Sequence, residues 1–184
     1  DCFLREYRAG RTPNPCVVCN KEIKFGLLLE KALALGADYI ATGHYAKIKN
    51  SKLFQAKDKE KDQSYFLWQL NQKQLSRVLF PVGDLTKKEV RKLAEKFGLP
   101  TFATPDSQEI CFVPDTINDF LAKHIKQKSG DIVDLRGKIS GKHHGLAFYT
   151  IGQRKGIGLP QGPYWVLEKD FKKNRLIVTK RKKD

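Results

Sequence analysis

The spacing of apolar side chains predicts helices and short strands in the first eighty residues. Ile23, Leu27, Leu28 and Ala32 recur at helical spacing, which predicts a helix over 22–35 that stops at Gly36. The apolar run 39–42 ends at Gly43 and predicts a buried strand that leads into a loop. Residues 47–57 alternate around Asn50-Ser51, as in a hairpin, and 72–79 are expected to form a short helix that Pro81 ends.

The clearest helix signal in the sequence lies over residues 87–97. Thr86 and Glu89 have the spacing of a capping box, and Gly98 with Pro100 follows the last turn. Four apolar residues form one face of this helix: Val90, Leu93, Ala94 and Phe97. Helix, strand and helix in this order predict part of a parallel α/β sheet.

The pattern changes after Cys111. A helix is predicted over 116–126, and beyond Ser129-Gly130 the chain turns to short runs separated by glycines. The predicted strands are Ile132–Val133, Leu146–Ile151, Tyr164–Leu167 and Leu176–Thr179. This shift places a domain boundary near 114–130 and predicts a small, mostly β second domain.

Charge narrows the range of partners. The chain has 35 Lys and Arg residues against 20 Asp and Glu, a formal net charge of +15, and such an excess favours binding to a polyanion. Aromatic side chains, with 11 Phe and 6 Tyr, can stack on unpaired RNA bases. A membrane partner is not expected, because the sequence has no long apolar run, and the charged first fifteen residues do not resemble a signal peptide.

Two cysteines, Cys16 and Cys19, follow the turn-rich run 10–15. Asn14 can cap a helix there, and Pro15 suits its first position because it has no N–H to leave unpaired. Both thiols then lie on one face, near a helix N-terminus and two lysines, conditions that lower a thiol pKa and favour the thiolate. The pattern indicates sulfur chemistry or metal ligation.

Spacing alone leaves several readings of the four cysteines open. They are too few for the disulfide framework of a small secreted domain. A Cys-x-x-Cys redox pair, a zinc site that adds Cys2 and Cys111, and inert buried thiols all remain open. Catalysis and metal binding are about equally favoured by spacing.

Six segments resemble the tRNA-specific 2-thiouridylases. They are 10–25 (GRTPNPCVVCNKEIKF), 41–45 (ATGHY), 61–66 (KDQSYF), 80–83 (FPVG), 106–112 (DSQEICF) and 152–156 (GQRKG). The resemblance implies an enzyme that replaces the 2-oxygen of the wobble uridine (position 34) with sulfur, using ATP with Mg²⁺. It implies the rear of a parallel-sheet, ATP-pyrophosphatase-like domain over 1–115 and a small central domain over 116–184.

The same resemblance implies where the protein acts and with what. Its partners would be the anticodon region of tRNA and a sulfur-donor protein of a persulfide relay, in the cytoplasm or in mitochondria. The chain has no methionine and shows no phosphate-binding loop, so it is expected to be the middle of a longer enzyme and inactive by itself.

The resemblance also assigns roles to residues. Cys111 would carry the persulfide, which attacks the base after ATP has adenylated it. Cys19 would be the nucleophile that then attacks the sulfur and forms a disulfide with Cys111. Asn14, Pro15 and Cys16 would meet the target base, and the backbone of Gly43 would lie against ATP. The resemblance assigns contacts with tRNA to six residues: His44, Lys61, Asp62, Gln63, Arg154 and Lys155.

Cys16 keeps a second mechanism open. Some family members have aspartate at this position, whereas a third thiolate allows Cys16, Cys19 and Cys111 to hold a [4Fe–4S] cluster. Both mechanisms require Cys19 and Cys111. The alternatives of another class are a non-catalytic RNA-binding module with a structural metal or cluster on its cysteines, and a relative that acts on another nucleobase.

Overall fold

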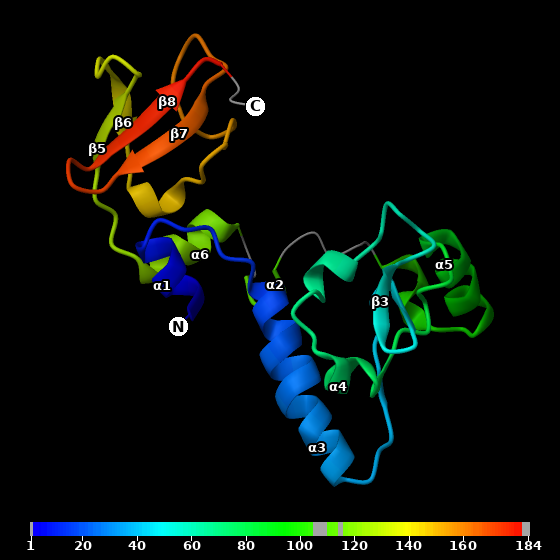
Figure 1. The fold of residues 1–184 in the computed structure, drawn as a ribbon. Coiled ribbons are helices and arrows are strands. Elements are labelled where there is room, and N and C mark those ends of the chain that lie inside the picture. The colour runs from blue at the N-terminus through cyan, green and yellow to red at the C-terminus, as the bar shows by residue number, and fades with distance from the viewer. Residues whose placement is uncertain (1, 105–109, 114–115, 182–184) are drawn as a thin grey trace. The chain divides into compact units, whose positions relative to one another are not determined.

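The computed structural model describes residues 2–104, 110–113 and 116–181, and the chain divides into two compact units (Figure 1). We call Asn14–Gln108 the inserted unit. We call Asp1–Pro13 together with Glu109–Asp184 the split unit. The domain ranges 1–115 and 116–184 stay a prediction.

A long helical segment carries Cys16 and Cys19 in the inserted unit. It consists of α2 (Pro15–Val18), the π-helix η1 (Cys19–Leu27) and α3 (Leu28–Ala34). The predicted cap is present, because the Asn14 side chain accepts a hydrogen bond from the Val17 N–H at 3.4 Å and Pro15 occupies the first turn. The helix predicted over 22–35 is therefore confirmed, but it begins seven residues earlier and its middle is wound as a π-helix.

The predicted strand at 39–42 forms as β1 (Ile40–Ala41) and pairs in parallel with β4 (Val78–Leu79). Ala41 is exposed, so the expectation of a buried strand is wrong for the described residues. The helix predicted over 72–79 is wrong in its second half, since α4 covers only Gln72–Leu75. A capping box between Asn71 and Gln74 starts α4, and the β-branched Val78 then pairs with Ile40.

The predicted hairpin is confirmed. β2 (Ala46–Lys49) and β3 (Lys52–Gln55) pair antiparallel around Asn50 and Ser51, whose φ angles of 51° and 54° are those of a tight hairpin turn. The hairpin packs on a core formed by Phe25, Ala46, Leu67, Leu70, Leu75 and Val78. A short 3₁₀ turn, η2 (Ser64–Phe66), precedes Leu67.

The predicted capping box of α5 (Lys87–Lys96) is also present. The Thr86 hydroxyl accepts from the Glu89 N–H at 3.3 Å, and the Glu89 carboxylate accepts from the Thr86 N–H at 2.6 Å. The expected apolar face is only partly covered by the described residues, because Val90 and Ala94 are half-buried whereas Leu93 and Phe97 are exposed. The 3₁₀ turn η3 (Pro100–Ala103) follows.

The split unit contains α1 (Cys2–Arg8), α6 (Ile117–His124) and a four-stranded sheet in the order β6-β5-β8-β7. The strands are β5 (Gly130–Val133), β6 (Ile139–His143), β7 (Trp165–Asp170) and β8 (Arg175–Thr179). β5 and β8 run parallel, and the other pairs are antiparallel. The sequence pattern predicted neither α1 nor β6.

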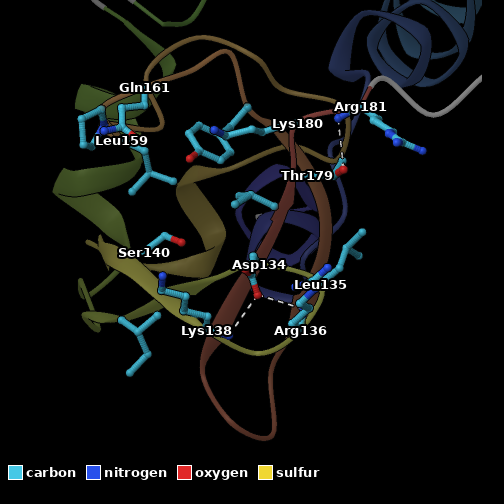
Figure 2. A pocket seen from close by; sticks show the side chains of 14 residues that line it. Asp134, Leu135, Arg136, Lys138, Ser140, Leu159, Gln161, Thr179, Lys180 and Arg181 are labelled. Atoms are coloured by element: carbon cyan, nitrogen blue, oxygen red, sulfur yellow. Dashed lines mark hydrogen bonds between the residues drawn. The ribbon is translucent and has the colours of Figure 1, made fainter.

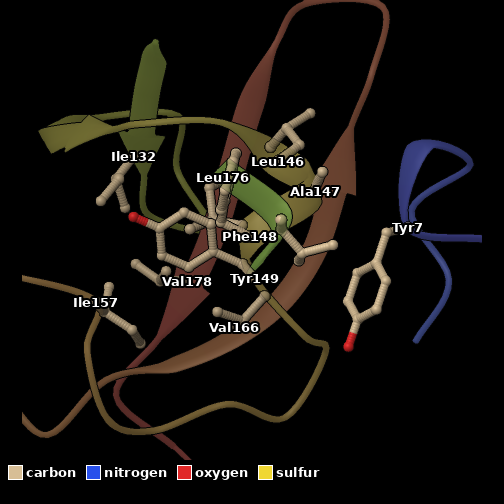
Figure 3. Packing of buried hydrophobic residues seen from close by; sticks show 11 residues of the cluster. Tyr7, Ile132, Leu146, Ala147, Phe148, Tyr149, Ile157, Val166, Leu176 and Val178 are labelled. Atoms are coloured by element: carbon tan, nitrogen blue, oxygen red, sulfur yellow. The ribbon is translucent and has the colours of Figure 1, made fainter. Parts of the chain in front are cut away.

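Both parts of the split unit contribute to one core (Figure 3). Tyr7 of α1 is 4% exposed and belongs to the same cluster as Ile132, Val166 and Leu176 of the sheet. The strand predicted at Leu146–Ile151 is wrong, because Leu146–Phe148 form a 3₁₀ turn, η4. All three of its side chains are buried, whereas a strand alternates its side chains between two faces.

No helix in the described part of the chain is long and apolar enough to cross a membrane.

Candidate functional site

A cavity of about 450 Å³ in the inserted unit is lined by residues from three separate segments. Lys24 and Leu28 come from the long helix, Gln63 comes from the loop before η2, and the loop after β1 supplies Thr42, Gly43 and His44. Three residues that the sequence singled out, Gly43, His44 and Gln63, therefore share one cavity. Lys24 and Thr42 were not predicted to belong to it.

His44 is held firmly at the wall of this cavity. Its Nδ1 atom lies 2.8 Å from the Thr42 hydroxyl, and its ring packs 5.8 Å from the rings of both Phe25 and Phe80. Burial, and then the nearby charge of Lys24, lower the pKa of His44 from 6.5 to about 4. The imidazole is therefore neutral at physiological pH. It can donate one hydrogen bond and accept another, but it cannot form an ion pair with a phosphate.

Gly43 leaves its side of the cavity open. A Cβ atom built on Gly43 would meet no described atom within 4 Å, so a ligand can approach the backbone closely. Lys24 adds a cation to the same lining. An open backbone next to a cation suits an anionic ligand, and these residues therefore fit a nucleotide.

The segment Lys61-Asp62-Gln63 mainly holds its own loop. The two oxygens of Asp62 accept hydrogen bonds from the Ala56 N–H and the Ser64 hydroxyl, each at 2.7 Å. The Gln63 side chain accepts from the Tyr45 N–H at 3.0 Å, next to His44. Of the three, Gln63 alone lines the described cavity, and the predicted tRNA contacts of this segment stay a prediction.

The helix that carries the cysteines is fastened to the rest of the inserted unit at two points. Buried Asn20 donates from its amide to the Phe66 carbonyl at 3.3 Å, and its Oδ1 has no partner among the described residues. Gln74 of α4 donates to the Phe25 carbonyl at 2.8 Å. Cys16 and Cys19 are half-buried near this anchored start, and π-helical turns occur often at functional sites.

Asn20 is a positioning residue that the sequence argument missed. The signal was available, since Asn20 directly follows Cys19 within the motif. Its amide joins this motif to the segment 61–66, another of the six motifs. Lys24 lies in the same motif, five residues after Cys19, but the sequence analysis used it only as a charge near the thiols.

Cys111 belongs to the split unit and is exposed. The neighbouring Phe112 ring packs 5.3 Å from Phe3 of α1 and 6.0 Å from Phe120 of α6. The preceding part of its motif, 106–109, lies outside the described residues. The described residues contain no cluster of three or more His, Cys, Asp or Glu suited to a metal ion.

Arg154 and Lys155 lie in an exposed turn of the split unit. The Arg154 guanidinium lies over the Trp165 ring at 5.7 Å, and the Gln153 side chain donates to the Lys155 carbonyl at 2.8 Å. The turn is therefore ordered by its own contacts. The predicted phosphate contact of these two residues stays a prediction.

Comparison with known proteins defines the class first. Residues 1–115 match a family described as the tRNA methyl transferase HUP domain, and residues 118–180 match the tRNA methyl transferase PRC-barrel domain. The chain therefore combines an ATP-pyrophosphatase-like α/β domain with a small barrel domain, as the fold class predicted in its coarse form.

Relatives then specify the family. The chain is 49% identical to the tRNA-specific 2-thiouridylase MnmA of Syntrophomonas wolfei, over 97% of this chain and 55% of the relative. It is 50% identical to the protein of that name from Alkaliphilus oremlandii, over 96% of this chain and 51% of the relative. A Fusobacterium nucleatum relative, named tRNA-specific 2-thiouridylase MnmA 1, is 51% identical over 97% of this chain and 51% of its own length. The chain belongs to the tRNA-specific 2-thiouridylase family and spans about half the length of these relatives.

Proposed function

We propose that the full-length protein is a tRNA-uridine 2-sulfurtransferase that replaces the 2-oxygen of uridine 34 with sulfur. The family and the names of the relatives support this activity. The observation that carries the proposal is the cavity of the inserted unit, where three motif segments that are distant in sequence meet at Lys24, His44 and Gln63.

ATP is the proposed ligand of this cavity. The open backbone at Gly43 admits the nucleotide, and Lys24 supplies a charge that attracts phosphate. ATP would supply the adenylate that makes the 2-oxygen a leaving group. Neutral His44, oriented by Thr42, would hydrogen-bond to a polar group of the bound RNA rather than neutralise a phosphate.

The cysteines are assigned the sulfur chemistry. Cys111, exposed and therefore accessible to a donor protein, would carry the persulfide. Its terminal sulfur forms a bond to C2 of the activated uridine as the C2–O bond to AMP breaks. Cys19 would then release the product by forming a disulfide with Cys111, which an external reductant must reduce. Asn14, Pro15 and Cys16 would lie against the base at the capped start of the helix.

A non-catalytic RNA-binding module with a metal or cluster on its cysteines is the alternative. It shares the basic charge with the enzyme but requires neither ATP nor turnover. Metal content and metal-dependent melting distinguish it from the enzyme.

The test is single-turnover thiolation by the full-length protein with tRNA, ATP and a persulfide donor. Digestion of the tRNA to nucleosides and mass spectrometry measure 2-thiouridine, and AMP is measured in parallel. We expect Cys19→Ser and Cys111→Ser each to abolish the product, and the matched control Cys2→Ser to retain nearly full activity. Full activity of Cys19→Ser would remove that residue from the mechanism. Methyl transfer from S-adenosylmethionine in place of thiolation would overturn the proposal as a whole.

A further inference from the structure

The split unit has a depression of its own, larger than the cavity of the inserted unit. It is a groove of about 730 Å³ that runs between the β5–β6 turn, the end of β8 and the loop 159–164 (Figure 2). We call it the basic groove. In Figure 2, Arg136 and Lys138 lie at one side of it, and Lys180 and Arg181 lie at another.

The charge of the basic groove is strongly one-sided. Its described lining contains four cations, Arg136, Lys138, Lys180 and Arg181, against the single carboxylate of Asp134. Asp134 is engaged in its own turn, where one oxygen accepts from the Arg136 and Lys138 N–H groups at 2.8 and 2.9 Å. These hydrogen bonds offset part of its charge, so the groove as a whole attracts an anion.

The cations are also placed by the fold. The Lys180 ammonium lies 5.3 Å from the centre of the Tyr164 ring, and that ring packs against the core of the split unit. The Arg181 N–H donates to the Thr179 hydroxyl at 3.2 Å, which fixes the chain just beyond β8. Gln161, at another edge, has a φ of +60°, a conformation that costs energy for a residue other than glycine.

Cations on two sides of an open, partly apolar groove match a strand of RNA. Phosphates alternate with sugars along such a strand, so Lys and Arg can pair with successive phosphates while Leu159 and Tyr164 contact the sugars. An acidic protein would instead be held by a few large side chains in well-packed pockets. The net charge of +15 also favours a polyanion as the partner.

We propose that the basic groove binds the sugar-phosphate backbone of the tRNA substrate, at a position other than the base that reacts. This inference rests on the proposed function, which makes tRNA the substrate. Contacts with phosphates carry no sequence information, so the groove would set the affinity and orientation of the tRNA rather than choose the base.

The experiment compares two double variants of the full-length protein with equal loss of charge. Lys138→Gln with Lys180→Gln removes a cation from each of two sides of the groove. Lys172→Gln with Lys173→Gln is the matched control, because these exposed lysines lie in the β7–β8 turn, at the other end of β8. Affinity for unmodified tRNA is measured by fluorescence anisotropy between roughly 50 and 400 mM salt, and thermal melting confirms that both variants fold.

Two lost phosphate contacts predict a definite result. Each contributes about 0.7–0.9 to the slope of log K against log salt, so the groove variant should lose about 1.6 from its slope. Because this contribution vanishes near 1 M salt, the same change weakens binding about twentyfold at 150 mM. The control should keep the slope of the parent. Equal slopes for the two variants would refute tRNA binding by the basic groove. Failure of the parent protein to bind or thiolate tRNA would refute the proposed function.

The acidic-protein reading has its own outcome. If the groove variant binds tRNA like the parent but fails to accept sulfur from a donor protein, the groove binds a protein and the proposal is wrong. Thiolation with a small-molecule persulfide donor separates this outcome from a defect in tRNA binding.

Discussion

Replacing His44 with glutamine should remove a defined part of the pH dependence of stability. The pKa of folded His44 is lowered to about 4 by burial and by Lys24, whereas an unfolded histidine titrates near 6.5. Between these values the unfolded state binds more protons than the folded state, so stability falls as the pH drops through this window. From pH 7 to pH 5 the loss due to His44 amounts to about 2 kcal/mol.

The assay is urea unfolding at pH 7 and pH 5 in a Trp165→Phe background. The chain has two tryptophans, so the remaining Trp68 reports on the inserted unit, which contains His44. We expect the parent to lose about 2 kcal/mol more than His44→Gln between the two pH values. His124→Gln is the control, since His124 lies in the split unit and should leave this difference unchanged.

Two results would refute the reasoning. One is an equal loss of stability in the parent and in His44→Gln. The other is an NMR titration that places the pKa of His44 at its ordinary value, because the packing against Phe25 and Phe80 would then not exclude water from the ring.

Three further predictions concern the inserted unit. Gly83→Ala should destabilise it by about 2 kcal/mol or more in urea unfolding, because a Cβ atom would collide with the Ala46 carbonyl. Gly43→Ala should leave the melting temperature of the inserted unit within about 2 °C of the parent but weaken ATP binding, measured by calorimetry. Unchanged ATP affinity would show that the nucleotide does not bind in this cavity. Cys16→Asp should thiolate tRNA without iron if the persulfide route operates. If a cluster is required, anaerobically reconstituted protein should bind about four irons and lose both iron and activity in Cys16→Ala.

Local rules predicted the parts of the fold that local chemistry decides. Asn14 and Thr86 cap helices where expected, and Asn50-Ser51 turn the hairpin, because each acts on its nearest backbone groups. Tertiary burial decided the rest. Leu146–Phe148 are buried together in a 3₁₀ turn, and β6 holds few apolar residues but pairs with β5.

The candidate site was predicted unevenly for a similar reason. Gly43, His44 and Gln63 were found through motifs, and the cavity unites them. Lys24 and Thr42 line the same cavity and lie within the motifs 10–25 and 41–45, but the resemblance assigned neither of them a role. The Asp62 carboxylate holds its own loop through two hydrogen bonds, and its expected contact with tRNA stays a prediction.

The interrupted path of the chain through the split unit has a consequence for synthesis. Tyr7 leaves the ribosome before Asn14–Gln108, but its partners Ile132, Val166 and Leu176 follow only after that whole segment. The core of the inserted unit can begin to pack meanwhile, since its described residues all lie within this range. Until then the apolar side chains of α1 remain exposed, and exposed apolar surface of this kind makes a partly folded chain prone to aggregate.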